Sequence, residues 1–209
     1  MITPAVFIVD DDLGVRDSLA MLLELKGFHT RTYESAEQFL ARYRPEWPGC
    51  LILDLRMAGM DGLALQAELA RRGAQLPIII VTAHGDVAAA RTALRAGAID
   101  FIEKPIDNEL LLAAVSAALE RDARSRDQAA VQAGFAERLA RLTAREREVL
   151  DMVVEGRHNR EIAAALRISP RTVEVYKSRL MEKLQVRRVP ELVKLVLATR
   201  RPADGPAPA

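Results

Sequence analysis

The stretch Cys50-Leu51-Ile52-Leu53-Asp54-Leu55-Arg56-Met57 carries an aspartate at the end of an apolar run. A glycine-containing loop, Ala58 to Gly62, follows it. A short apolar run bounded by turn residues is typical of a strand buried on both faces of a parallel sheet. Asp54 is therefore predicted at the carboxyl end of a buried strand, where reacting groups gather in open α/β sheets. A buried carboxylate is costly unless a cation meets it.

Runs that predict strands recur along the first half of the chain and alternate with segments of helical periodicity. The predicted strands are residues 5–9, 28–33, 50–54, 76–82 and 99–103. The predicted helices are residues 17–26, 36–43, 63–72, 86–96 and a last one that begins near 108. Five repeats of strand then helix are the signature of a doubly wound parallel sheet, so residues 1–121 are predicted to form an α/β domain.

The second half of the chain has a different organisation. Residues 122–140 are rich in charge and lose the apolar stripe, and they predict a helical linker. Residues 141–201 show only short helices and predict a small all-α domain. Residues 202–209, built of Pro, Ala, Asp and Gly, predict a disordered tail.

The charge of the chain is divided between these halves. Residues 142–201 hold 14 of the 30 Lys and Arg residues but only 8 of the 29 Asp and Glu residues, which leaves 16 basic and 21 acidic residues elsewhere. A basic second half is a candidate for binding nucleic acid, whereas the acidic first half points to a different partner.

Composition and segment lengths bound the class of protein. At 28% charged and 50% hydrophobic residues, the chain is typical of a globular protein. No apolar run approaches the ~20 residues of a membrane span, and the first residues do not form a signal peptide, so no membrane partner is expected. The lone Cys50 excludes an internal disulfide. A cytoplasmic location is the expectation from these features.

Polar residues follow the predicted strands at the ends that share one edge of a parallel sheet. They are Asp10 and Asp11, Asp54, Thr82 and Lys104. Three carboxylates repel one another unless a hard cation lies among them, and Mg²⁺ takes such oxygen ligands together with phosphate oxygens. A hydroxyl and an ammonium group suit the remaining phosphoryl oxygens, and aspartate is a known type of nucleophile for phosphoryl transfer.

The basic half contains signals for a helix-turn-helix. Thr143 and Glu146 predict a capping box, and Ser169-Pro170 predicts the start of a longer helix. In that helix the spacing of apolar residues predicts a buried stripe at Val173, Tyr176, Leu180 and Leu184. A short helix, a tight turn and a longer helix with a polar, basic outer face are the geometry that enters the DNA major groove. A small helical bundle with a solvated face is the alternative.

Residues 5–121 resemble the receiver domain of bacterial two-component response regulators, whose fold is flavodoxin-like. The resemblance rests on Val9-Asp10-Asp11-Asp12, on Leu53-Asp54-Leu55-Arg56-Met57, on Thr82-Ala83 and on Phe101 through Lys104-Pro105. It implies that Asp54 accepts phosphate from a histidine kinase. It also implies that Asp10, Asp11, Asp54 and the main-chain carbonyl of Arg56 hold Mg²⁺, that Thr82 and Lys104 bind the phosphoryl group, and that Phe101 repositions with Thr82.

The same resemblance implies a cis peptide bond between Lys104 and Pro105. The sequence departs from the family at Ala58, where proline usually follows Met57. His84 is read as an exposed loop histidine, with a catalytic role as the alternative.

Residues 142–197 resemble the LuxR-type helix-turn-helix domain, and with the receiver in front the chain is similar to regulators of the FixJ subfamily. The second resemblance rests on Leu142-Thr143, Glu161-Ile162-Ala163 and Ser169-Pro170-Arg171-Thr172-Val173-Glu174-Val175. It implies contacts to DNA from Asn159, Ser169, Arg171, Thr172, Glu174, Val175, Lys177, Ser178, Arg179 and Lys183. Of these, Glu174, Val175 and Ser178 are expected to face base edges, and most of the others phosphate. Arg167 and Gln185 stand where glycine is common, which indicates altered helix ends or a residue with positive φ.

Together the residues and the resemblances predict a transcription regulator rather than an enzyme. Phosphorylation of Asp54 is expected to drive formation of a homodimer that binds double-stranded promoter DNA, with RNA polymerase as a further partner. One alternative is a hydrolase that uses Asp54 as nucleophile, but Arg56 stands where such an enzyme would carry a second acid. Another is a constitutive DNA-binding protein whose receiver serves only as a scaffold.

Overall fold

The computed structural model describes residues 3–82 and 87–200. The chain divides into two compact units, Met1–Arg126 and Asp127–Ala209, and the boundary falls within helix α5 (Asn108–Ala140). His84, the predicted start of a helix at residue 86 and the predicted disordered tail lie outside the described residues. Among the described residues, no helix is long and apolar enough to cross a membrane.

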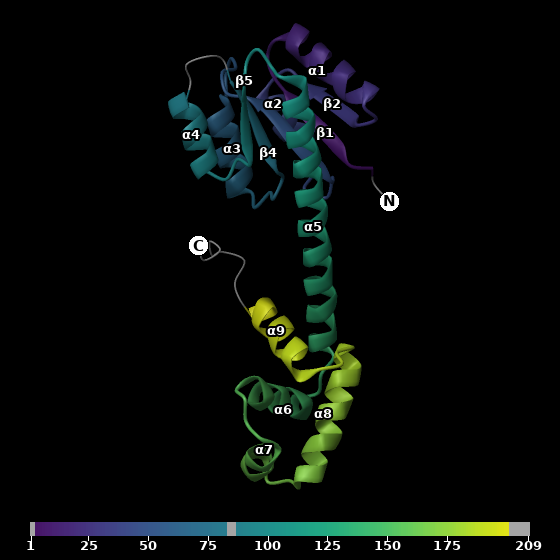
Figure 1. The fold of residues 1–209 in the computed structure, drawn as a ribbon. Helices are drawn as coiled ribbons and strands as arrows, with labels where there is room; N and C mark the ends of the chain where they lie inside the picture. Colours follow the sequence, from purple (N-terminus) through teal and green to yellow (C-terminus); the bar gives the residue numbers. More distant parts are fainter. Residues whose placement is uncertain (1–2, 83–86, 201–209) are drawn as a thin grey trace. The chain divides into compact units, whose positions relative to one another are not determined.

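The first unit contains a five-stranded parallel sheet with the order β2-β1-β3-β4-β5 (Figure 1). Its strands are β1 (Ala5–Val9), β2 (His29–Tyr33), β3 (Gly49–Asp54), β4 (Ile78–Thr82) and β5 (Asp100–Glu103). β1, β3 and β4 are buried along their whole length, as expected for inner strands covered on both faces. The prediction of a doubly wound parallel sheet is confirmed.

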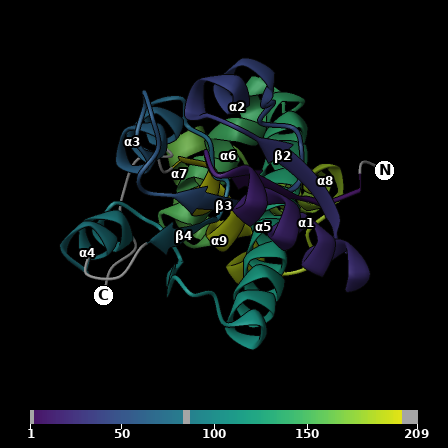
Figure 2. The same ribbon diagram turned by 90° about the horizontal axis from the view of Figure 1, so that it is seen from above.

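Helices cover both faces of this sheet (Figure 2). They are α1 (Leu13–Leu25), α2 (Ala36–Arg42), α3 (Gly62–Arg71), α4 (Val87–Arg95) and the first turns of α5. Alternate side chains of β3 point to the two faces: Leu51 and Leu53 pack with the cluster that includes α2 and α3, whereas Ile52 packs with α1 and α5. The apolar runs of the strands therefore supply two cores at once.

Helix α1 begins earlier than the sequence indicated, at Leu13 rather than at residue 17. Asp12 is its N-cap, and its carboxylate accepts from the main-chain N–H groups of Gly14 and Val15. The first turn carries no buried apolar residue, which is why its periodicity was weak. The capping aspartate was the available signal.

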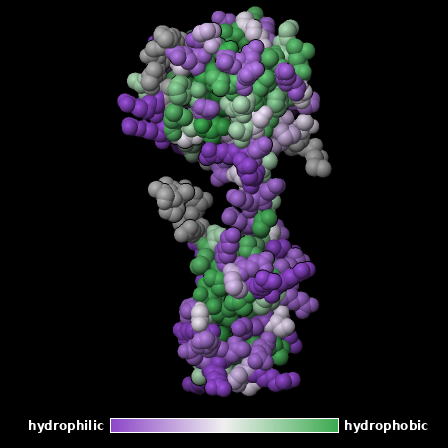
Figure 3. Space-filling model, viewed as in Figure 1, coloured by the Kyte–Doolittle hydropathy of each residue, from purple (hydrophilic) through white to green (hydrophobic). Residues whose placement is uncertain are grey.

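Helix α5 continues without a break through residues 122–140. The buried carboxylate of Asp122 accepts from the Gly49 N–H at 2.9 Å and from Arg126 Nε at 2.8 Å. Arg126 also donates to the carbonyls of Pro45 and Trp47. These contacts attach α5 to the loop before β3, so the helix belongs to the first unit past residue 121. The exposed middle part of α5 is mostly hydrophilic in Figure 3.

The second unit packs four further helices around one core. They are α6 (Ala144–Val154), α7 (Asn159–Leu166), α8 (Pro170–Leu184) and α9 (Val189–Arg200). Val173, Leu180 and Leu184 of α8 are buried and Tyr176 is partly buried, which confirms the predicted stripe. Phe135, from the segment predicted as linker, is fully buried in the same core.

The predicted helix starts of this unit are also confirmed. Thr143 and Glu146 form a capping box at the start of α6. At the start of α8, Ser169 Oγ accepts from the Thr172 N–H at 3.1 Å, and Pro170 is the first helical residue.

Two non-glycine residues end helices with a left-handed backbone. Arg167 ends α7 with φ 54° and Gln185 ends α8 with φ 56°, as their places in the motif indicated. An L-residue pays about 1 kcal/mol for this conformation, whereas glycine adopts it freely.

Arg167→Gly is therefore expected to raise the free energy of unfolding of the second unit by about 1 kcal/mol. Arg160→Gly, inside the same helix, is the control and is expected to lower it by about 1 kcal/mol. Thermal unfolding followed by circular dichroism measures both. A decrease for Arg167→Gly would contradict the strain argument.

Candidate functional site

The polar residues predicted at the strand ends meet at one edge of the sheet. Asp54 pairs in register with Val81, and Thr82 pairs with Glu103, so the ends of β3, β4 and β5 lie side by side. Asp10 is 2% exposed, Asp54 5% and Thr82 3%. The parallel strands therefore bring two carboxylates and a hydroxyl to the same edge with little access to water.

Lys104 is the cation that meets Asp54. Its ammonium nitrogen Nζ lies 2.9 Å from Asp54 Oδ1 and 2.9 Å from Asp10 Oδ2. Its main-chain N–H donates to the Thr82 carbonyl at 2.8 Å, which fixes the end of β5 beside β4. The Lys104–Pro105 peptide bond is cis, as the resemblance implied.

The pKa values of Asp54 and Lys104 reflect this pairing. Burial raises the pKa of the Asp54 carboxyl, and the hydrogen bond and charge of Lys104 oppose the rise without cancelling it. Burial lowers the pKa of Lys104, but its bonds to Asp10 and Asp54 outweigh this, and the net pKa is raised. A carboxyl pKa that is higher in the folded state stabilises the fold only at low pH. That contribution is lost as the pH rises through the folded pKa, so ionised Asp54 costs stability at neutral pH.

Main-chain N–H groups hold the remaining carboxylate oxygens. Asp54 Oδ2 accepts from the Arg56 N–H at 2.9 Å, and Asp10 Oδ1 accepts from the Asp12 N–H at 2.9 Å. Asp11 Oδ2 accepts from the Ala58 N–H at 3.0 Å. This contact across 47 residues was not found by sequence reasoning, since nothing in the local pattern reports a side-chain rotamer.

The donor set suits a magnesium ion in its chemistry, because it consists of carboxylate and carbonyl oxygens. Among the residues that the structure describes, however, no three of the His, Cys, Asp and Glu side chains are gathered closely enough to hold a metal. Lys104 engages Asp10 and Asp54, and Asp11 is bonded to the loop. The residues expected to hold the ion therefore fit it by ligand type.

Phe101 lies on β5 in register with Ile80 and is 40% exposed. Its ring is thus turned outward, on the same surface as the exposed Leu110 of α5. The side chain predicted to reposition therefore lies at the surface and not in the core.

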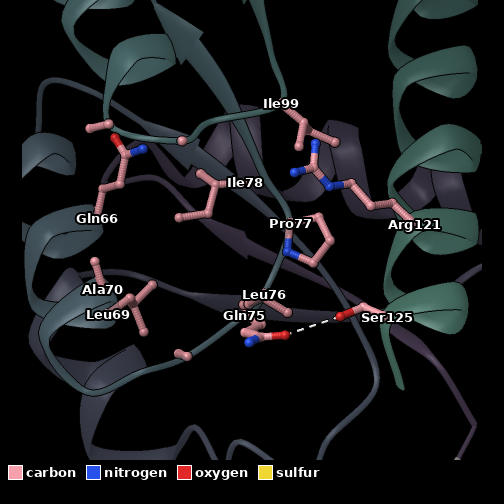
Figure 4. A pocket seen from close by; sticks show the side chains of 13 residues that line it. Gln66, Leu69, Ala70, Gln75, Leu76, Pro77, Ile78, Ile99, Arg121 and Ser125 are labelled. Atoms are coloured by element: carbon pink, nitrogen blue, oxygen red, sulfur yellow. Dashed lines mark hydrogen bonds between the residues drawn. The ribbon is translucent and has the colours of Figure 1, made fainter. Parts of the chain in front are cut away.

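A cavity of about 280 Å³ lies at the opposite end of β4 from Thr82, between α3 and α5 (Figure 4). Gln66, Ile78 and Arg121 are among the residues that line it, and Ser125 donates to Gln75 at its rim. It has no contact with the acidic edge and takes no part in the site.

The outer face of α8 carries the residues predicted to bind DNA. Arg171, Glu174, Ser178 and Arg179 are exposed, and Val175 exposes 44% of its surface although it is apolar. The α7–α8 pair thus has the form of a helix-turn-helix whose second helix presents polar and basic side chains.

Two lysines of this face have partners within the unit. Lys177 Nζ donates to Asn159 Oδ1 at 3.0 Å, which joins α8 to the start of α7. Lys183 Nζ lies 2.7 Å from the buried carboxylate of Glu146, whose pKa is lowered chiefly by that hydrogen bond. Sequence reasoning placed Lys183 among the DNA contacts and did not identify Glu146 as its partner, which lies 37 residues away.

Two family models match the chain. The model described as "Response regulator receiver domain" matches residues 6–116, and the model described as "Bacterial regulatory proteins, luxR family" matches residues 140–196. Transcriptional regulatory protein FixJ of Azorhizobium caulinodans is 45% identical over 204 residues, which cover 97% of each chain. Transcriptional regulatory protein TdiR of Thauera aromatica is 40% identical over 211 residues, 97% of this chain and 93% of the relative.

Solved structures show the same relationship. The response regulator StyR has a TM-score of 0.80 at 41% identity, over 94% of this chain and 99% of StyR. Full-length FixJ from B. japonicum has a TM-score of 0.59 at 36% identity, over 95% of this chain and 98% of that structure.

Proposed function

The chain belongs to the FixJ-type response regulators, transcription factors with a receiver and a LuxR-type DNA-binding domain, and on that premise we propose that Asp54 is its phosphoacceptor. The observation that carries this proposal is the pair of 2.9 Å contacts from Lys104 to Asp54 and Asp10. A buried carboxylate beside an ammonium group is a suitable nucleophile for phosphoryl transfer.

The proposed donor is a phosphohistidine on the cognate sensor kinase. An Asp54 carboxylate oxygen attacks phosphorus, the phosphorus–nitrogen bond breaks, and the kinase imidazole leaves with a proton from solvent. Mg²⁺ bound by Asp10, Asp11, Asp54 and the Arg56 carbonyl would neutralise charge on the phosphoryl oxygens. Lys104 supplies a second positive charge at the same edge.

Phosphorylation adds close to two negative charges and three acceptor oxygens to the carboxyl end of β3. We propose that Thr82 and Lys104 turn to bind these oxygens and that Phe101 turns inward into the space that Thr82 leaves. The surface of α4, β5 and α5 then changes shape. The added charge thus favours one of two conformations of this surface. Once Phe101 has turned inward, the exposed Leu110 of α5 is an apolar group on this surface that a second receiver would cover.

Pairing of two receivers would bring two α8 helices to half-sites about one DNA turn apart. Avidity then supplies affinity that one small domain lacks. We propose that Glu174, Val175 and Ser178 face base edges and that Ser169, Arg171, Thr172, Lys177 and Arg179 mostly contact phosphate or frame the bases, with Asn159 and Lys183 as further DNA contacts. To contact DNA, the Lys183 ammonium group must either bind DNA while it stays paired with Glu146 or leave Glu146.

The proposal also covers catalytic turnover, cellular location and domain limits. The relatives are transcriptional regulators, and we assign this chain no turnover beyond slow loss of its own phosphoryl group. We propose a cytoplasmic location for the protein, because its proposed partners, the kinase, promoter DNA and RNA polymerase, are found there. We propose a receiver at residues 1–121, a linker at 122–140 and a DNA-binding domain at 141–201, in which Asp122 and Arg126 attach the start of the linker to the receiver and Phe135 packs its end in the core of the second unit.

The test is phosphorylation with a small acyl phosphate in the presence of Mg²⁺, followed by intact-mass measurement. Wild type is expected to gain one phosphoryl group and Asp54→Asn to gain none. Asp100→Asn, an acid of the same domain away from the polar edge, is the control and is expected to react like wild type. Equal labelling of Asp54→Asn would reject Asp54 as the acceptor.

A further inference from the structure

The loop between β3 and α3 is held by three carboxylates, which come from β3, from the loop between β1 and α1, and from α2. Alternate main-chain N–H groups of the loop each donate to one of them: Arg56 to Asp54 Oδ2 at 2.9 Å, Ala58 to Asp11 Oδ2 at 3.0 Å, and Met60 to Glu37 Oε1 at 2.9 Å. The hydrogen bonds of Arg56 and Met60 leave the proposed metal ligands where they are needed, because Asp54 is already at the edge and Glu37 is not a ligand. The bond of Ala58 is different.

Asp11 is a proposed ligand of the metal, yet its carboxylate is bonded to the loop. Asp10 and Asp54 already share Lys104, and Asp11 does not join them in a group of three within the described residues. We propose that the Ala58 N–H holds Asp11 in a resting position and that Asp11 must leave this donor before Mg²⁺ is fully bound. This inference rests on the proposed function, since it concerns the same site.

The identity of residue 58 decides whether this hydrogen bond exists. Every residue except proline carries a main-chain N–H, and the receiver resemblance has proline at this position. Alanine at this position supplies a donor that proline lacks. In this proposal the contact competes with the metal for one of its ligands.

The competition has a direct consequence for affinity. A net hydrogen bond to a solvent-exposed carboxylate changes an equilibrium roughly three- to tenfold. Without the Ala58 donor, no hydrogen bond has to be broken before Asp11 binds the metal. Mg²⁺ binding is then expected to become tighter by that factor. Ala58 is a positioning residue, because it acts on the metal through Asp11.

The experiment is calorimetric titration of the full-length protein with Mg²⁺. Ala58→Pro is expected to bind Mg²⁺ roughly three- to tenfold more tightly than wild type. Ala58→Gly keeps the N–H and is expected to match wild type. In an Asp11→Asn background the proline substitution is expected to lose its effect, because the two groups act as one pair.

A second measurement does not need the proline variant to fold. In the wild type, Mg²⁺ is expected to move the Ala58 amide proton resonance upfield, as it loses its carboxylate acceptor. The Met60 resonance, whose acceptor is Glu37, is the internal control and stays in place.

The outcomes separate the two proposals. If wild type binds Mg²⁺ but Ala58→Pro binds it equally or more weakly, the resting position of Asp11 is wrong while Asp54 remains the phosphoacceptor. If the Ala58 amide resonance does not move on saturation with Mg²⁺, the proposed resting position of Asp11 is likewise wrong. If neither protein binds Mg²⁺, both the inference and the proposed metal site fail.

Discussion

Lys104→Met is expected to lower the free energy of unfolding of the receiver by about 3 kcal/mol in the absence of Mg²⁺. Removing one partner of a buried ion pair leaves an uncompensated charge, and here two buried carboxylates, Asp10 and Asp54, lose the same cation. The 26% exposure of the Lys104 side chain lets water screen part of this cost, so the lower end of the usual range applies.

Urea denaturation followed by fluorescence of Trp47 measures the effect, because Trp47 is the chain's one tryptophan and lies in the receiver. Lys26→Met, at the exposed end of α1, is the control and is expected to change stability by less than about 0.5 kcal/mol. Saturating Mg²⁺ is expected to recover much of the loss, because a bound cation replaces the missing charge. A variant that is stable in the absence of Mg²⁺ would show that Lys104 is not needed to hold the two carboxylates.

Phe135→Ala is expected to lower the free energy of unfolding of the second unit by about 3–5 kcal/mol. Phe135 is fully buried with Leu142, Val149 and other core residues of that unit, although it belongs to α5. Truncation leaves a cavity that the surrounding helices fill only in part. The last turns of α5 are thus part of the DNA-binding unit's core.

The two units provide an internal comparison for this variant. Far-ultraviolet circular dichroism is expected to show an early transition from the second unit, while Trp47 fluorescence reports an unchanged receiver. Val131→Ala, one turn earlier on α5 and 56% exposed, is expected to remain within about 0.5 kcal/mol of wild type. If Phe135→Ala behaves like Val131→Ala, the packing of Phe135 does not stabilise the unit.

The sheet and the polar edge were predictable because both follow from local patterns and one rule of topology. Buried inner strands read as continuous apolar runs, and parallel strands bring their carboxyl ends to one edge. Asp10, Asp54, Thr82 and Lys104 therefore met as expected. At Arg167 and Gln185 the sequence left altered helix ends or positive φ as alternatives, and the structure has positive φ at both.

The long-range polar contacts were not predictable in the same way. The bond from Ala58 to Asp11 and the ion pair of Lys183 with Glu146 depend on rotamers of side chains that are far apart in sequence. The helical state of residues 122–140 was predicted and is confirmed, whereas the polar attachment of this segment through Asp122 and Arg126 was not predicted. Their i, i+4 spacing was the signal available.

Charge added at Asp54 is expected to control the pairing of receivers, and this pairing changes the mass of the particle in solution. Light scattering of the full-length protein with Mg²⁺ gives its mass with and without beryllofluoride, a mimic of the phosphoryl group. Wild type is expected to change from monomer to dimer, and Asp54→Asn is expected to remain a monomer. A wild type that keeps its mass, or an Asp54→Asn variant that dimerises equally, would contradict the account.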